Sequence, residues 1–256
     1  MRSNRASIRA AIITAITILF STVSFANRDG AMKYAPADDC IRLLETIYRN
    51  VNNPTAKGYS AKYSITTRST INGKQRETTM NVDVAFTSKR LRLESHEMEL
   101  YQDGELSVLV LPQSRTIYLT PLDAKAREQR SSMLAGLNEA MLKGSDVVEC
   151  ADVREKGADR RIRLRAGEST RRLLRINTIS YLVSSSAGRI RELAIQYLPG
   201  GQVDEVRMVF TSMTEGVDQA AFDRPLLSNI YSAGGDLLPR LKGFRVMDLR
   251  GKGRKR

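Results

Sequence analysis

Residue types that build many active sites are scarce in this chain of 256 residues. It has no tryptophan, one histidine (His96) and two cysteines, Cys40 and Cys150. A single histidine cannot form a zinc site or a relay with other histidines, and neither cysteine has a companion at metal-binding spacing. Aromatic residues make up 6% of the chain, which disfavours a surface that stacks on sugar rings. We therefore predict no metal and no cofactor.

Recognisable catalytic motifs are absent as well. The sequence contains no G-x-S-x-G elbow, no phosphate-binding loop and no H-E-x-x-H. Asp38 and Asp39 stand at the start of a predicted helix, where capping explains them better than paired acid–base catalysis. His96 lies on a half-exposed strand edge without an identifiable partner, which is typical of a surface histidine. We predict that the protein is not an enzyme, and we assign no catalytic residue.

The apolar runs of the sequence are too short for a membrane helix. The first of them, residues 10–20, follows a basic stretch that contains Arg2, Arg5 and Arg9. The segment 24–26 (SFA) then places small residues at the −3 and −1 positions of a cleavage site. This order predicts a signal peptide over residues 1–26 and export to the periplasm of a Gram-negative bacterium. An uncleaved N-terminal anchor is the alternative.

Export bears on the two cysteines, because the compartment it leads to is oxidising. Cys40 and Cys150 are therefore a candidate disulfide, and two separately buried thiols are the alternative. The loop that this bond closes spans about 110 residues, for which chain entropy allows a stabilisation of up to ~4–5 kcal/mol.

Acidic residues are too few to balance the basic ones. The chain has 28 Asp and Glu against 41 Lys and Arg, a formal net charge of +13. Removing the three arginines of the signal peptide leaves +10, and half of that charge lies in the tail 250–256, at Arg250, Lys252, Arg254, Lys255 and Arg256. Such a tail is expected to be disordered and attracted to anionic surfaces, or simply to aid solubility. For an exported chain, anionic lipid or an acidic envelope protein is a better partner than nucleic acid.

Apolar and polar residues alternate from Lys57 to Thr120, which predicts a meander of antiparallel strands. Apolar side chains share one parity around the dipeptide Asn72-Gly73, a strong signal for a two-residue hairpin turn. On either side of it the sequence places Tyr59, Ala61, Tyr63, Ile65, Met80, Val82, Val84 and Phe86. Residues 107–111 are nearly all apolar, which indicates a strand buried on both faces.

Helical periodicity appears over residues 37–51 and 122–142, and more weakly over 226–231. A second series of strands is predicted at 147–153, 160–164, 173–184, 189–198 and 203–214, with a last short strand at 244–249. The predicted fold class is α+β: a strongly curved antiparallel sheet of about ten strands, an unclosed half-barrel, with helices over its concave face. We expect a linker at 27–36, one domain over 37–249 and the basic tail.

The order of these elements resembles the LolA/LolB-like superfamily of periplasmic lipoprotein carriers and receptors. The run 176–210 (INTISYLVSSSAGRIRELAIQYLPGGQVDEVRMVF) looks like the long hairpins of that group, with G-x-I after the turn. The resemblance covers about 37–249 and lies in pattern and order, not in a diagnostic motif. It implies a lumen that shields lipoprotein acyl chains in transit between membranes, with no cofactor and no chemistry. The basic tail and the candidate disulfide depart from the carriers.

Our leading hypothesis is a monomeric, non-enzymatic protein that binds lipid or lipoprotein acyl chains in an apolar lumen. The predicted lining is Tyr63, Ile65, Val82, Val84, Leu91, Leu93, Leu100, Leu109 and Ile117 of the sheet, with Met133, Leu137 and Met141 of the helix 122–142. The alternative is an envelope interaction module with a packed core. Its basic surface, formed by the tail and the arginines within 160–175, would meet an acidic partner or an anionic membrane.

Overall fold

The structure is a computed structural model that describes residues 36–52, 58–87, 90–122, 142, 144–153, 159–184, 187–218, 222 and 224–251. The predicted signal peptide, most of the predicted helix 122–142 and the tail residues 252–256 therefore lie outside the described residues. Within the described part, no helix has both the length and the apolar character needed to cross a membrane.

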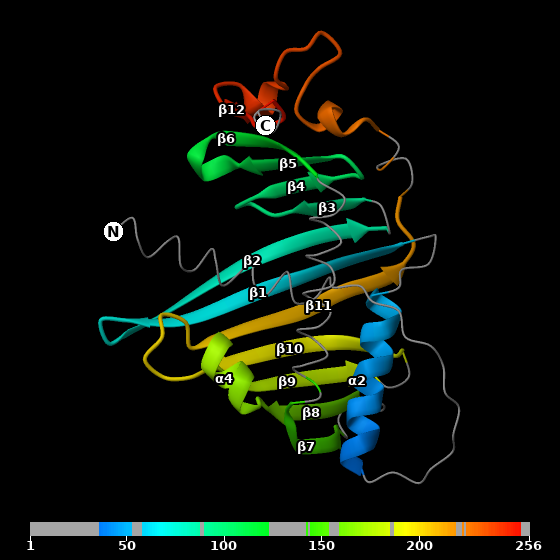
Figure 1. The fold of residues 1–256 in the computed structure, drawn as a ribbon, viewed down its shortest axis with the longest axis vertical. Coiled ribbons are helices and arrows are strands. Elements are labelled where there is room, and N and C mark those ends of the chain that lie inside the picture. Colours follow the sequence, from blue (N-terminus) through cyan, green and yellow to red (C-terminus); the bar gives the residue numbers. More distant parts are fainter. Residues whose placement is uncertain are drawn as a thin grey trace. The chain divides into compact units, whose positions relative to one another are not determined.

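Within the described residues, twelve strands form one sheet, which can be followed in Figure 1. In sheet order they are β12 (Arg245–Asp248), β6 (Thr116–Pro121), β5 (Leu106–Leu111), β4 (Glu99–Gln102), β3 (Leu91–Glu94), β2 (Lys74–Phe86), β1 (Tyr59–Ile71), β11 (Glu205–Glu215), β10 (Arg189–Tyr197), β9 (Ile176–Ser184), β8 (Asp159–Arg165) and β7 (Asp146–Val153). The sheet is open, because β12 and β7 are its two edges, and β12 runs parallel to β6. The α+β class and the unclosed antiparallel sheet are confirmed, with twelve strands where about ten were predicted.

The chain divides into two compact units, and each consists of several segments. Unit 1 comprises 1–53, 63–79 and 130–211, and unit 2 comprises 54–62, 80–129 and 212–256. Strands β1, β2 and β11 contribute residues to both. The predicted division into linker, domain and tail stays a prediction, and the two units are described in turn.

The hairpin of β1 and β2 in unit 1 turns where the sequence predicted. Asn72 and Gly73 have φ angles of 52° and 72°, the left-handed conformation that a type I′ turn requires at both positions. Across the hairpin the hydroxyls of Thr66 and Thr79 lie 3.0 Å apart, and the Arg68 Nε donates to Glu77 at 2.8 Å.

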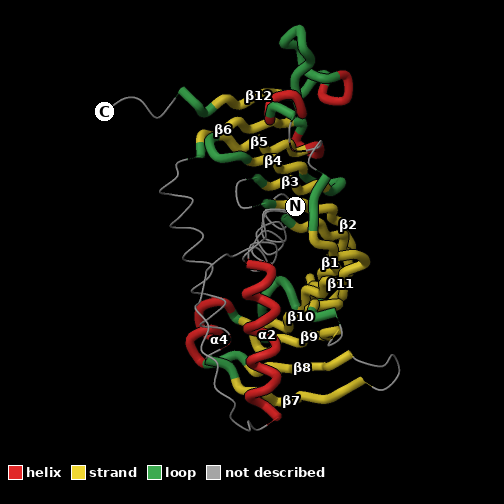
Figure 2. Tube along the Cα trace, turned by 90° about the vertical axis from the view of Figure 1, so that its right-hand side faces the viewer, coloured by secondary structure: helices red, strands yellow, loops and turns green. Residues whose placement is uncertain are grey.

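The helix α2 (Pro36–Asn52) covers part of the unit 1 sheet and contacts β7, as Figure 2 also shows. Its buried residues recur at three- and four-residue steps: Cys40, Leu44, Ile47 and Tyr48. Cys40 is bonded to Cys150 of β7, with the two Cα atoms 6.3 Å apart, so the predicted disulfide is confirmed. On the same face the Tyr48 and Tyr181 hydroxyls lie 3.1 Å apart, fully inside the protein.

One predicted strand is partly wrong. Residues 173–184 were expected to be a single strand, but α4 (Glu168–Leu174) occupies the beginning and β9 starts at Ile176. Glu168 in the first turn and Arg171 and Arg172 in the last turn suit the helix dipole, and Arg175 ends the helix in the left-handed conformation. Leu173 is 75% exposed, so its apolar character misled the strand assignment.

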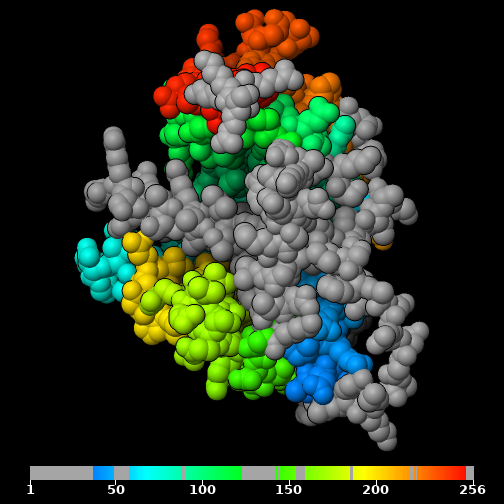
Figure 3. Space-filling model, in the orientation of Figure 1, coloured from blue at the N-terminus to red at the C-terminus, as the bar shows by residue number. Residues whose placement is uncertain are grey.

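In unit 2 a C-terminal segment covers one face of the sheet, and we call residues 224–249 the C-terminal cap. The cap contains the 3-10 helices η3 (Leu226–Asn229) and η4 (Pro239–Leu241) and the strand β12. Its buried Ile230 and Leu241 pack in one cluster with Tyr101, Val108, Val110, Ile117 and Leu119 of the strands. The space-filling view shows the cap, orange to red, resting on the green strands (Figure 3). The predicted weak helix and last strand are thereby confirmed.

Candidate functional site

Four of the predicted lumen residues form a straight row across the unit 2 sheet. Val84 pairs with Leu93, Leu93 with Leu100, and Leu100 with Leu109. Residues directly opposite one another in neighbouring strands point to the same face. We call these four residues the leucine row. Val84 and Leu93 are buried, whereas Leu100 and Leu109 are half-buried.

Two more predicted residues share the face of the leucine row. Val82 lies two positions before Val84 in β2, and Leu91 lies two positions before Leu93 in β3, so the strand alternation turns all of them the same way. Val82 is buried and Leu91 is half-buried. Six of the predicted residues are therefore brought together on one apolar face.

Ile117 is a correction to the predicted set, because it lies on the other face. The register pairs Ile117 with Val110, while Leu109 pairs with Tyr118. Ile117 is fully buried against the C-terminal cap. Both faces of β5 are apolar, so the alternation of residues could not tell which neighbours of β6 share the face of Leu109. The turn at Arg115, with a φ of 46°, fixes that register instead.

The remaining predicted residues are divided between unit 1 and the part of the chain that is not described. Tyr63 and Ile65 of β1 are 2% and 1% exposed. The Tyr63 ring lies 5.2 Å from that of Phe210, its hydroxyl has no hydrogen-bond partner among the described residues, and burial raises its pKa. Met133, Leu137 and Met141 lie outside the described residues. Whether any of these side chains contacts a ligand stays a prediction.

On the cap side of unit 2, a polar cluster surrounds the buried Tyr101. Its hydroxyl donates toward Glu94 at 2.7 Å and Glu99 at 2.9 Å, two carboxylates that lie directly opposite each other in β3 and β4. Arg92 donates twice to Glu94, both at 2.9 Å, and Arg240 of the cap donates to Glu99 at 2.7 Å. The two arginines offset the repulsion between the carboxylates, so the cluster fastens the cap to the sheet.

These contacts shift the protonation equilibria of the cluster. Burial alone would raise the pKa of Glu94, but the hydrogen bonds from Arg92 and Tyr101 outweigh it, so the pKa lies below its usual range. Burial and then the adjacent carboxylates raise the pKa of the Tyr101 hydroxyl, which stays protonated. Glu94 is accordingly ionised at neutral pH and accepts hydrogen bonds.

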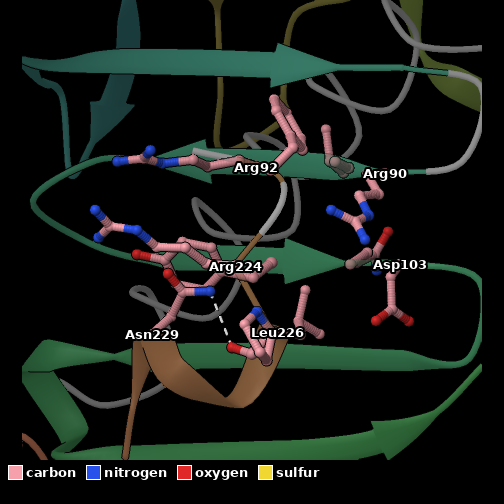
Figure 4. A pocket seen from close by; sticks show the side chains of 11 residues that line it. Arg90, Arg92, Asp103, Arg224, Leu226 and Asn229 are labelled. Atoms are coloured by element: carbon pink, nitrogen blue, oxygen red, sulfur yellow. Dashed lines mark hydrogen bonds between the residues drawn. The ribbon is translucent and has the colours of Figure 1, made fainter. Parts of the chain in front are cut away.

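Unit 2 also contains a small pocket at the ends of β3 and β4, next to η3 (Figure 4). The free volume is about 70 Å³, and the lining is Arg90, Leu91, Arg92, Tyr101, Gln102, Asp103, Phe222, Arg224, Pro225, Leu226 and Asn229. In Figure 4 the side chains of Arg92 and Arg224 extend to the same side of the view, and Arg90 lies at the other end beside Asp103. We call this the arginine pocket.

A second pocket, in unit 1, is larger and of different character. Its free volume is about 560 Å³ and its lining is largely polar: Arg68, Thr70, Gln75, Arg76, Glu77, Asn177, Gln196, Tyr197, Pro199, Asp204 and Glu205. Several of its polar groups bind each other, since Arg68 pairs with Glu77 and the Thr70 hydroxyl donates to Asp204 at 2.7 Å. Because three carboxylates and two arginines line this pocket, it has no excess of positive charge that would attract an anion.

Neither pocket was predicted from the sequence. Arg90 and Arg224 are more than a hundred residues apart in the chain, and no local pattern indicates that they meet. Of the arginines within 160–175 that the sequence assigned to a basic surface, Arg160, Arg161, Arg163 and Arg165 lie on β8. Arg171 and Arg172 belong to α4, and the Arg175 Nη2 donates to the Pro199 carbonyl at 2.7 Å. In the described part of the chain, no group of three or more His, Cys, Asp or Glu residues is placed to hold a metal ion.

No family model and no curated protein matches this chain. Among solved structures, it is similar to an uncharacterized conserved protein from Thermus thermophilus, with 8% identity, a TM-score of 0.43 and coverage of 82% of this chain and 99% of that one. A LolA superfamily protein from Nitrosomonas europaea matches with 9% identity, a TM-score of 0.30 and coverage of 75% and 99%. The complex of MucA and MucB from Pseudomonas aeruginosa matches with 11% identity, a TM-score of 0.40 and coverage of 73% and 61%.

A structure that bears the name of the LolA superfamily is among those that match this chain. What this chain binds is argued below from its own residues.

Proposed function

We propose that this chain is an exported, non-enzymatic protein that binds the acyl chains of a lipid or lipoprotein on the face of the leucine row. The observation that carries the proposal is that the strand β5 is apolar on both faces, while among the described residues the C-terminal cap packs on one of them. An antiparallel sheet that leaves one face to water normally carries polar residues there. In β5, Val108 and Val110 face the cap, and Leu109 faces the other way.

The burial of the row supports the same reading. Val84 and Leu93 are buried, but Leu100 and Leu109 keep part of their surface exposed and continue the row toward β6. An alkyl chain laid along them would remove apolar surface from water, at about 0.8 kcal/mol for each methylene buried. The contribution of the alkyl chain to the affinity would then grow with its length.

The test is native mass spectrometry of protein purified without detergent, followed by titration with a fluorescent fatty acid. The double substitution Leu100→Gln/Leu109→Gln should weaken binding by about tenfold or more, because both side chains would lose apolar contact with the alkyl chain. The control is Leu173→Gln, the same chemical change at an exposed position of α4, which should bind like the wild type. Absence of carried lipid together with no fluorescence gain would refute the proposal.

A second function, binding of an acidic partner or an anionic membrane, is favoured by one observation on unit 1. Arg161, Arg163 and Arg165 alternate along β8, and all three are exposed on one face. Arg163 pairs with Glu149, while the facing positions of β9 are Leu182, Ser180 and Thr178, none of them charged. Vesicle binding that weakens with salt and disappears on substituting Arg161→Gln/Arg165→Gln or deleting 250–256 would favour it. Binding of lipid that does not depend on salt would argue against this second function.

A further inference from the structure

We propose that the arginine pocket is the seat of an anionic headgroup, a phosphate or a carboxylate, and that the amphiphile bound by this protein is therefore negatively charged. The inference rests on the proposed function, because it assigns the headgroup of the same ligand whose alkyl chain lies on the leucine row.

Charge is the first argument. Three arginines and one carboxylate line the pocket. The carboxylate of Asp103 binds the neighbouring backbone: its Oδ1 accepts hydrogen bonds from the N–H groups of Glu105 and Leu106, both at 2.8 Å. An anion that enters would therefore meet more positive than negative charge. The carboxylate of Asp103 is already hydrogen-bonded to the backbone of its own turn.

The second argument concerns which arginines remain available. Arg92 is held by Glu94 in a two-point ion pair. The guanidinium groups of Arg90 and Arg224 have no ion-pair or hydrogen-bond partner within the described part of the chain. Guanidinium groups bind phosphate and carboxylate through two parallel N–H donors, so these two side chains are suited to an oxyanion.

Size and lining restrict what the pocket accepts. The free volume of about 70 Å³ is much smaller than the 560 Å³ of the unit 1 pocket, which suits a compact group such as a phosphate or a carboxylate. The apolar walls are Leu91, Phe222, Pro225 and Leu226, and Phe222 is buried. Charge pairing is stronger beside such low-dielectric walls than in open water.

Leu91 connects the pocket with the proposed acyl-chain site. It lines the arginine pocket, and it also lies on the face of the leucine row, two positions before Leu93 and directly opposite Phe86. A ligand whose anion sits in the arginine pocket can thus continue over Leu91 onto the row. The unit 1 pocket offers no such continuity, because its described lining is polar apart from Tyr197 and Pro199.

The experiment compares a fluorescent fatty acid with its methyl ester on the full-length protein. The wild type should bind the acid about tenfold more tightly than the ester, because the ester lacks the charge that the arginines recognise. Arg90→Gln/Arg224→Gln should bind the two probes equally, with the affinity that the wild type has for the ester. The matched control Arg189→Gln/Arg207→Gln removes two exposed arginines from β10 and β11, outside the pocket and the row, and should keep the tenfold preference. A pocket variant that retains the preference overturns the headgroup assignment while leaving acyl-chain binding intact.

If neither probe binds, the proposed function fails, and a thermal shift with inorganic phosphate decides the pocket separately. A rise in melting temperature that vanishes in Arg90→Gln/Arg224→Gln supports an anion seat, and the lack of any rise overturns it. A lysophosphatidylglycerol that binds more tightly than inorganic phosphate identifies a lipid as the source of the anion. Equal affinity of the two identifies a free anion.

Discussion

In unit 1 a helix lies on the sheet and is joined to it covalently, whereas in unit 2 the covering segment is held by side-chain contacts and one strand pairing. α2 is tied to β7 by the Cys40–Cys150 disulfide and to β9 by the pair Tyr48–Tyr181. The C-terminal cap relies on Ile230 and Leu241 in the cluster, on Arg240 and on the pairing of β12 with β6.

The two units differ in how their strands divide apolar and polar residues between the two faces of the sheet. In unit 1 the charged arginines of β8 alternate with buried Ile162 and Leu164, so that strand has one polar face and one covered face. In unit 2 the strand β5 has no polar face, and the cap accounts for one side of it. Among the described residues, the face of β5 opposite the cap is apolar as well, and this face is the physical basis of the proposed binding site.

The largest expected effect comes from breaking the covalent tie of unit 1. Cys40→Ser/Cys150→Ser should lower the free energy of unfolding by about 2–5 kcal/mol, since the bond closes a loop with a sequence separation of 110. Urea unfolding with and without reductant measures it. Reductant should destabilise the wild type and leave the double variant unchanged, and equal stability of the two proteins would contradict the role given to the bond.

Truncating the anchor of the cap should cost nearly as much. Ile230→Ala removes a side chain that is 0% exposed and should destabilise the protein by about 2–4 kcal/mol. Chemical denaturation gives the value. Leu173→Ala, at a residue that is 75% exposed, serves as the control and should change stability by no more than about 0.5 kcal/mol.

A smaller loss is expected from the tyrosine pair of unit 1. Burial raises the pKa of Tyr48 to about 12, so both hydroxyls are neutral and one donates to the other. Tyr48→Phe or Tyr181→Phe leaves the other hydroxyl buried without its partner and should cost about 1–3 kcal/mol. The double substitution should cost less than the sum of the single ones, and strict additivity in this cycle would show that the hydroxyls do not interact.

The smallest effect concerns acid sensitivity in unit 2. Because the folded-state pKa of Glu94 is depressed, its stabilising contribution is present above its unfolded-state pKa of about 4.3 and disappears as the pH falls through the folded-state value. Glu94→Gln should therefore flatten the dependence of stability on pH below about 5. The urea midpoints of both proteins, measured across this pH range, test the prediction. Parallel curves would show that Glu94 does not contribute to the pH dependence of stability.

Much of the fold could be predicted because its signals are local. The turn at Asn72-Gly73 needs only two residues that tolerate positive φ, and α2 needs only an apolar stripe and acids in its first turn. The burial of β5 on both faces could also be predicted, because its residues are nearly all apolar. Where a local signal was ambiguous, as at Leu173 or Ile117, the prediction was wrong, because apolar character alone does not reveal the neighbour that covers it.

The sequence by itself determined the open antiparallel sheet, the position of its turns and the pair of cysteines able to bond. Only the tertiary structure decided which leucines align across neighbouring strands, which face the cap covers, and that Arg90 and Arg224 line one pocket. The reason is physical: alternation sets the direction of a side chain relative to its own strand, whereas register and long-range packing decide what it meets there.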